Sequence, residues 1–150
     1  MSTARPELLY EADFYAWTQE QAKELRRLAR TRSNVPLDLP HIAGEIQDLG
    51  KSEYEAGFSL TQRIIEHLLL VEHSPARDQR LHWADEIDDF RDAIDRKLSP
   101  SIRRRLKREL DAAFARACRR VRRKLGAAAR LPAQCPYTLE QLLGDWLPEH

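Results

Sequence analysis

Glycine, cysteine and long apolar runs are all scarce in this sequence, and each scarcity excludes a class of protein. Five glycines, none of them in an Asn-Gly or Asp-Gly pair, argue against β-hairpins and therefore against strands. The two cysteines, Cys118 and Cys135, lack the paired spacing of a disulfide framework or a zinc site. No apolar run reaches the ~18–20 residues that span a membrane, and the first residues lack the apolar core of a signal peptide. These features predict a cytoplasmic protein without a membrane segment.

Charge, in contrast, is abundant and unevenly distributed. Charged residues make up 33% of the 150 residues, while the 42% that are hydrophobic suffice for one core. We therefore expect a single helical domain over residues 1–150. The net charge of +1 conceals a basic segment, because residues 101–130 hold 12 basic and 2 acidic side chains. Residues 1–100 hold 13 basic and 19 acidic side chains, so opposite charges can pair within the chain or recruit a polyanion.

Apolar residues recur at steps of three and four, which is the period of an amphipathic helix. The pattern predicts four long helices over residues 14–30, 39–73, 78–98 and 100–125, and a short last helix that starts at Thr138. Asp13 is the expected N-cap of the first helix, and Thr138 opens a capping box with Gln141. Residues 31–36 are the clearest loop. Short connections favour antiparallel neighbours, so the predicted fold is all-α, an antiparallel bundle of about four long helices with a short C-terminal helical appendage.

The second helix carries the longest apolar stripe, which we expect to face the core: Ile42, Ile46, Leu49, Ala56, Leu60, Ile64, Leu68 and Val71. Ile65 and Leu69 lie on the opposite side of that helix, and Leu81 lies on the outer side of the third helix. Apolar residues on outer faces indicate a second buried surface. It would receive either the C-terminal segment or another copy of the protein.

Four blocks, spread in order over nearly the whole chain, resemble one family. They are Tyr-Glu-Ala-Asp-Phe-Tyr-Ala-Trp at 10–17, Ile-Ala-Gly-Glu-Ile-Gln-Asp-Leu-Gly-Lys-Ser-Glu at 42–53, His-Leu-Leu at 67–69, and Cys-Pro-Tyr-Thr-Leu-Glu-Gln-Leu-Leu at 135–143. The chain is similar to the family catalogued as domain of unknown function number twenty-nine, small bacterial proteins without an assigned activity. The resemblance implies an all-helical fold, a complete chain and no inherited chemistry.

The second helix is also where a metal-dependent enzyme would place its ligands, because it carries Glu45, Glu53 and His67. Glu53 and His67, however, lie ~21 Å apart on a straight helix, whereas metal ligands lie within ~2–2.6 Å of one ion. The Glu-x-x-His pattern of di-iron bundles is absent, as are a serine elbow and a phosphate-binding glycine loop. We therefore assign no catalytic, cofactor-binding or metal-binding residue and no cofactor, and expect the chain not to be an enzyme.

Glu53 and His67 both fall near the apolar stripe, where an ionisable group needs a partner. We interpret both as structural. For Glu53 the expected partner is Arg91 or Arg103. For His67 it is a neighbour near the hairpin turn between the second and third helices, with Trp83 lying opposite.

The basic helix over residues 101–125 is the best argument for nucleic acid as a partner. Three observations weaken it: its charges point all round the helix, Phe114 is the one aromatic residue among them, and the acidic third helix is expected to be its neighbour. The preferred hypothesis is a non-catalytic helical module for protein interaction or regulation that associates with itself or another protein. An electrostatic nucleic-acid binder is the alternative, and a metal-dependent enzyme comes third.

Overall fold

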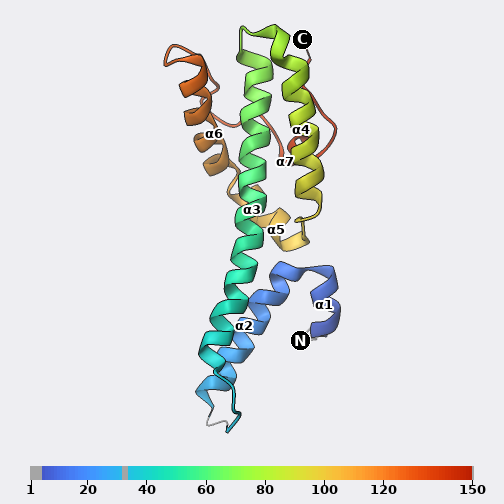
Figure 1. Cartoon of the computed structure of the whole chain (residues 1–150), viewed down its shortest axis with the longest axis vertical. Helices are drawn as coiled ribbons and strands as arrows, with labels where there is room; N and C mark the ends of the chain where they lie inside the picture. Colours follow the sequence, from blue (N-terminus) through green and yellow to red (C-terminus); the bar gives the residue numbers. More distant parts are fainter. Residues whose placement is uncertain (1–4, 32–33, 150) are drawn as a thin grey trace. The chain divides into compact units, whose positions relative to one another are not determined.

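The computed structural model describes residues 5–31 and 34–149, and within these ranges it contains helices and no strand (Figure 1). The prediction of an all-α fold is confirmed. Arg32 and Ser33, which belong to the predicted loop, lie outside the described residues. The α-helices are α1 (Pro6–Ala12), α2 (Phe14–Arg30), α3 (Leu39–His73), α4 (Arg80–Asp95), α5 (Pro100–Arg108), α6 (Leu110–Leu125) and α7 (Leu139–Leu143), with one 3₁₀ turn, η1 (Arg77–Gln79). Among the described residues, no helix combines the length and the hydropathy that a membrane crossing needs.

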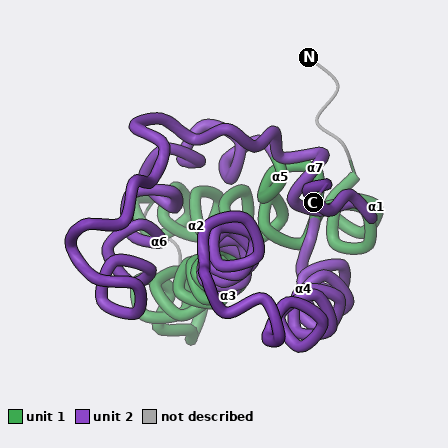
Figure 2. Tube along the Cα trace, turned by 90° about the horizontal axis from the view of Figure 1, so that it is seen from above, with its two compact units in different colours: residues 1–55, 99–103 green, residues 56–98, 104–150 purple. Residues whose placement is uncertain are grey.

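The chain divides into two compact units (Figure 2). The first unit consists of residues 1–55 and 99–103, and the second of residues 56–98 and 104–150. Helix α3 contributes its N-terminal part to the first unit and the rest to the second. A single domain over the whole chain stays a prediction.

Two predicted helix starts are confirmed in atomic detail. The Asp13 carboxylate caps α2 by accepting the Ala16 N–H at 3.0 Å. The Thr138 hydroxyl accepts the Gln141 N–H while the Gln141 side chain accepts the Thr138 N–H, which is the reciprocal capping box. Helix α1 was not predicted, since its seven residues are too few for a periodic pattern to emerge.

The predicted helix over residues 100–125 is wrong in one respect, because it is divided at Glu109. Glu109 has φ −102° and ψ 16°, outside the helical range. Its N–H still bonds the Arg105 carbonyl and its own carbonyl accepts the Ala113 N–H, so it ends one helix and begins the next. No proline or glycine marks this break. The third predicted helix is also shorter than expected, because a 3₁₀ turn precedes it.

In the second unit, α3 is enclosed on almost every side. From residue 61 to residue 71, Arg63 alone is exposed. Helices α4, α6 and α7 lie around this part of α3 in both ribbon views (Figures 1 and 2). Ile65 and Leu69 are completely buried, which confirms the predicted second buried surface of this helix, whereas Leu81 is 75% exposed and does not belong to it.

In the first unit, α2 and α3 approach each other through small residues. They run antiparallel, and Arg26 Nη2 donates to Gln47 Oε1 at 2.6 Å across the pair. Thr18, Ala22, Ala43 and Gly50 are buried at the contact. A Cβ placed on Gly50 would lie 2.0 Å from Thr18 Oγ1, so the Thr18 side chain occupies the space that a larger residue at position 50 would need.

This close approach corrects the predicted core stripe. Ile42 and Leu49 lie roughly 80–100° around α3 from Gly50. Ile42 and Ile46 are consequently half-buried and Leu49 is 55% exposed, although all three were expected in the core. The physical reason is that helices pack at their narrowest line of contact, and here that line passes through the small residues.

Gly50→Ala and Gly44→Ala should change stability in opposite directions. At Gly50 the new methyl meets Thr18, whose hydroxyl is anchored on the Tyr15 carbonyl at 2.7 Å, so we expect a loss of ~1–3 kcal/mol. At Gly44 nothing lies within 4 Å of the new methyl, so alanine should add ~0.5–1 kcal/mol. Urea unfolding of both variants measures the difference. Equal effects would show that α2 and α3 do not touch at Gly50.

Candidate functional site

His67 is buried on α3 and has a protein partner on each ring nitrogen. Nδ1 lies 2.8 Å from the Arg63 carbonyl oxygen, and Nε2 bonds the Glu86 carboxylate. The ring also meets the edge of Phe90, with 5.0 Å between the centroids. A neighbour on the adjacent helix was expected, but the contacts lie one and two turns beyond Trp83.

Glu86, which the sequence analysis missed, is the centre of this cluster. Its second oxygen lies 3.3 Å from Nε2 of His82, one turn earlier on α4. The carboxylate thus bridges a buried and an exposed histidine. The signal available in the sequence was the i, i+4 spacing of His82 and Glu86, which places the two side chains on one helix face.

The other residues of the metal-dependent alternative are not brought together. Glu45 is exposed and Glu53 is half-buried, both in the first unit, while His67 belongs to the second. Within the described parts of the chain, no group of three or more His, Cys, Asp or Glu side chains could hold a metal ion. The absence of catalytic residues stays a prediction.

Arg91 is not the partner of Glu53, so this predicted pair is wrong. Its guanidinium is buried and donates three hydrogen bonds to backbone carbonyls of the C-terminal segment. Nε bonds Leu142 at 2.9 Å, and Nη2 bonds Gln141 at 2.9 Å and Trp146 at 2.7 Å. Burial lowers the pKa of the guanidinium, and the negative charges of Asp88 and Asp145 offset only part of this decrease. A pairing of Glu53 with Arg103 stays a prediction.

Arg91 therefore fastens the C-terminal segment to α4. The carbonyls at the end of α7 lack intrahelical partners, and a buried cation is a strong donor to them. The segment is held at a second point, because the Tyr137 hydroxyl donates to Glu72 Oε1 at 3.2 Å. The sequence offered one sign of this role, because Arg91 has the helical spacing of the apolar residues Ile87 and Ile94. All three side chains are buried in the structure.

The basic residues of α6 all lie on its exposed side, spread over roughly 200° of the helix. The buried residues Ala113, Phe114, Ala117, Cys118 and Val121 form the opposite face. The exposed face carries six cations: Arg116, Arg119, Arg120, Arg122, Arg123 and Lys124. We call these six residues the cationic face.

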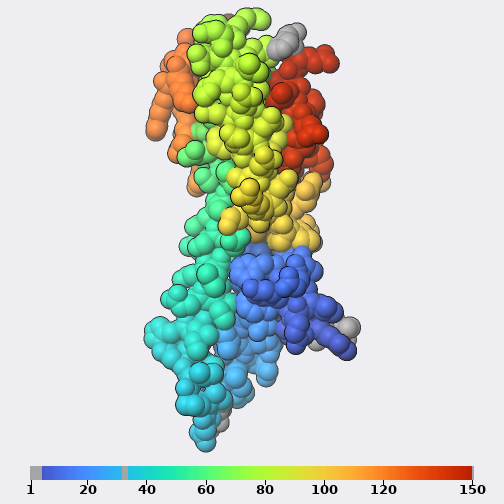
Figure 3. All heavy atoms as spheres, turned by 45° about the vertical axis from the view of Figure 1, so that its right-hand side comes forward, coloured from blue at the N-terminus to red at the C-terminus, as the bar shows by residue number. Residues whose placement is uncertain are grey.

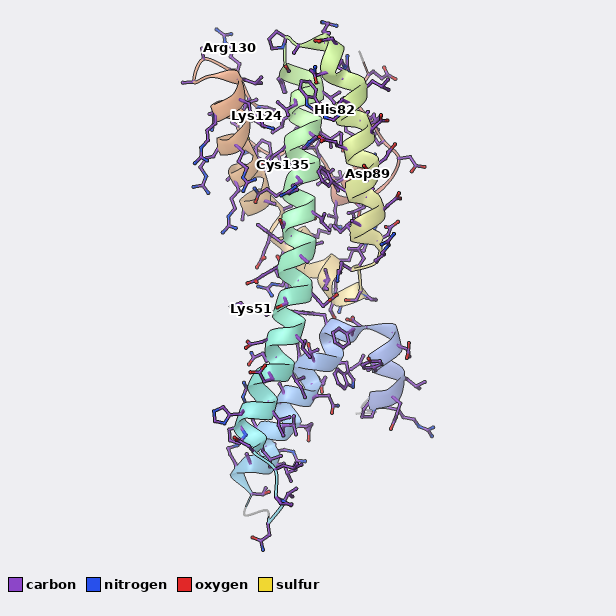
Figure 4. The ribbon with its side chains drawn as sticks, in the orientation of Figure 1. Lys51, His82, Asp89, Lys124, Arg130 and Cys135 are labelled. Carbon is purple, nitrogen blue, oxygen red and sulfur yellow. The ribbon has the colours of Figure 1, made fainter. Side chains whose placement is uncertain are left out.

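The acidic helix does not cover the cationic face either. Helix α3 lies between α6 and α4 in both ribbon views, and the labelled Lys124 and Asp89 belong to helices on either side of it (Figures 1, 2 and 4). The cations of α6 contact α3 instead, since Arg120 pairs with Glu66 at 3.4 Å and the Arg116 guanidinium lies 5.1 Å from the centroid of the Phe58 ring. The expected neutralisation by α4 is therefore wrong, because α4 is not the neighbour.

The two cysteines offer no activated nucleophile. Cys118 and Cys135 both line a hollow of about 730 Å³ between α6 and the segment that follows it. Burial raises the pKa of both thiols. The charge of Arg122 partly offsets this rise for Cys118, and a hydrogen bond to the Tyr137 backbone partly offsets it for Cys135. A thiol that stays protonated at neutral pH is a poor nucleophile.

An apolar surface remains uncovered on the first unit. Consider two antiparallel helices that touch along one line. Residues that lie in the same direction of rotation about their own helix axis from this line are on the same side of the helix pair. Leu28 of α2 and Ile42, Ile46 and Leu49 of α3 meet this condition. Of these, Leu49 is exposed and the other three are half-buried. We call these four residues the hairpin flank.

Comparison with known proteins gives a family and a fold. A family described as "Domain of unknown function DUF29" matches residues 9–147. A crystal structure of an alpha-helical protein of unknown function from Rhodospirillum rubrum is similar, with 30% sequence identity and a TM-score of 0.80. The match covers 89% of this chain and 88% of that one. No curated protein sequence matches.

Proposed function

This chain belongs to the DUF29 family, whose function is unknown, and on that premise we propose that it is a non-catalytic helical interaction module that associates with a second copy of itself. The observation that carries the proposal is the hairpin flank. Four large aliphatic side chains lie on one side of a two-helix pair whose own contact uses small residues. A soluble protein gains free energy by covering such a surface.

A second copy fits this surface for a geometric reason. Two helix pairs that bring their apolar sides together make a four-helix arrangement, the common way to bury amphipathic helices. A twofold axis would place each flank against its equivalent. Val35 and Leu37, in the connection between the two helices, are 40% and 57% exposed and extend the apolar surface.

Leu49→Glu should convert a dimer into a monomer without unfolding it. Leu49 is already 55% exposed, so the folded chain tolerates a charge there. Losing a leucine contact removes ~1.5 kcal/mol or more, and a twofold interface loses it twice, so dimerisation should weaken roughly a hundredfold. Sedimentation equilibrium measures the change.

Leu81→Glu is the matched control, because Leu81 is 75% exposed but belongs to the second unit. It should leave the dimer intact. A monomeric wild-type protein, or equal weakening by both variants, would contradict the proposal.

Polyanion binding through the cationic face is the second candidate function. Two findings favour it: the six cations share one face, and α3 separates them from the acidic helix. Such a face attracts phosphates and releases their counterions. No aromatic side chain is exposed among the described residues of α6, since its Phe114 is 5% exposed, so contacts would go to the backbone of a duplex rather than to stacked bases.

Arg119→Ala with Arg123→Ala should weaken duplex DNA binding and lower its salt dependence. Each lost phosphate contact reduces the slope of log K against log salt by ~0.9, so the double variant should lose roughly 2. Fluorescence anisotropy over a salt series provides the slopes. Lys23→Ala with Arg30→Ala, two exposed cations on α2, is the control for net charge alone. The same slope in both double variants would exclude a defined cationic site.

A further inference from the structure

Two adjoining hollows lie where α4 begins, beside the last residues of the chain. Their volumes are about 380 Å³ and about 460 Å³, and Val71, Arg77, Arg80 and Pro148 line both of them. Figure 3 shows the C-terminal segment beside the start of α4 on one face of the molecule. Volumes of ~300–1,000 Å³ are typical of small-molecule sites.

Arg80, which lines both hollows, has a side-chain hydrogen-bond donor without a partner in the described part of the chain. Its Nε–H is buried and has no hydrogen-bond partner among the described residues. A buried donor without an acceptor is costly and rare in a folded protein. Arg77 lines the same hollow. The acceptor that best matches a guanidinium is a carboxylate, which can take two parallel hydrogen bonds from it.

The second hollow offers apolar walls next to these arginines. Leu81 and Leu147, which are 75% and 39% exposed, line it together with Ala84, and one carboxylate, that of Asp78, lines it as well. Leu81 is thus a large aliphatic side chain that the chain itself leaves uncovered. A ligand anchored by its carboxylate on Arg80 could cover Leu81 with an apolar group.

Two carboxylates line the first hollow and would repel a simple anion. They belong to Glu72 and Glu149. Glu72 Oε1 accepts the Tyr137 hydroxyl, while Oε2 lies 3.6 Å from His73 Nε2. A ligand with a cationic group beside its carboxylate would satisfy both signs of charge in this hollow.

We propose that the two hollows form a binding site for a free apolar α-amino acid. Its carboxylate bonds Arg80 and Arg77, its ammonium faces Glu72 and Glu149, and its side chain lies against Leu81 and Leu147. The site lies wholly in the second unit, so it does not depend on the hairpin flank.

Three probes of the same shape test the chemistry. L-leucine carries both charges, L-leucinamide lacks the carboxylate, and 4-methylpentanoate lacks the ammonium. Isothermal titration calorimetry on the full chain should give binding of leucine, and binding at least tenfold weaker for each of the other two. Leucinamide binding as tightly as leucine would overturn the role of the arginines. Absence of any heat with leucine at millimolar concentrations would overturn the site.

Variants locate the site. Arg80→Met should abolish leucine binding, and Arg80→Lys, which keeps the charge but loses the Nε–H, should weaken it at least tenfold. Arg96→Met, an exposed arginine at the other end of α4, should bind leucine like the wild type. Circular dichroism confirms that each variant is folded. Unchanged binding in a folded Arg80→Lys variant contradicts the proposal, while the Leu49→Glu variant should bind leucine normally whether or not it dimerises.

Discussion

Arg91→Ala should lower the free energy of unfolding by about 4 kcal/mol and release the C-terminal segment. Its three hydrogen bonds come from one buried charged donor, and removing one partner of such a buried charged group typically costs ~3–5 kcal/mol. The substitution leaves the carbonyls of Gln141, Leu142 and Trp146 without their donor. Urea unfolding followed by circular dichroism measures the loss. Hydrogen exchange over residues 137–149 should accelerate before the rest of the chain unfolds.

Two further variants distinguish the hydrogen bonds of the guanidinium from the effect of its positive charge on stability. Arg91→Lys keeps a cation but has no planar fork to reach three carbonyls, so it should recover less than half of the lost stability. Arg96→Ala, an exposed arginine of the same helix end, should change stability by no more than ~0.5 kcal/mol. If Arg91→Ala and Arg96→Ala are equally stable, the C-terminal segment is held by other contacts.

Asp13→Ala should cost about 3 kcal/mol, because one carboxylate serves two helix starts. Oδ1 accepts the Ala16 N–H of α2, and Oδ2 accepts both the N–H and the hydroxyl of Ser101 in α5, at 2.9 and 2.6 Å. An N-cap is worth ~0.5–2 kcal/mol, and here two caps are lost together with a charged acceptor. Thermal unfolding at pH 7 measures the effect. Asp48→Ala removes an exposed carboxylate in the interior of α3 and should have little effect.

Asp13 also predicts a dependence on pH. Burial opposes its ionisation, but the hydrogen bonds from Ser101, Ala16 and Ser99 outweigh it and hold the pKa below its ordinary 3.8. A lowered pKa in the folded chain means that this contribution is complete above 3.8 and is lost as the pH falls through the folded value. Wild-type stability should therefore fall more steeply than that of Asp13→Ala below pH 4. Parallel curves would show that the carboxylate is not ionised in these contacts.

Periodicity and capping chemistry were sufficient to predict most helices of this fold. The start of α2 at Asp13, the end of α3 before Ser74 and the capping box at Thr138 all follow from local side-chain chemistry. The break at Glu109 could not be predicted, because no residue there disfavours a helix.

The choice of packing face was also beyond the sequence. A stripe of large aliphatic residues predicts which side of a helix is apolar, but Gly50 and Thr18 determine where α2 and α3 touch. Arg91 could be recognised as an arginine on an apolar face, yet its partners lie 50–55 positions away. The exposed side of α6 could not be chosen from the sequence, because charged residues of α5 and α6 were taken together as one helix over residues 100–125.

The carboxylate of Asp13 and the backbone of Ser101 are 88 positions apart, so their contact has a consequence for synthesis. A ribosome must translate residues 14–100, including all of α2, α3 and α4, before this double cap can form. The first unit is therefore incomplete on the nascent chain until α5 has emerged. Until then the hairpin flank belongs to an unfinished unit, and a chaperone or a neighbouring nascent chain can meet it before the unit is complete.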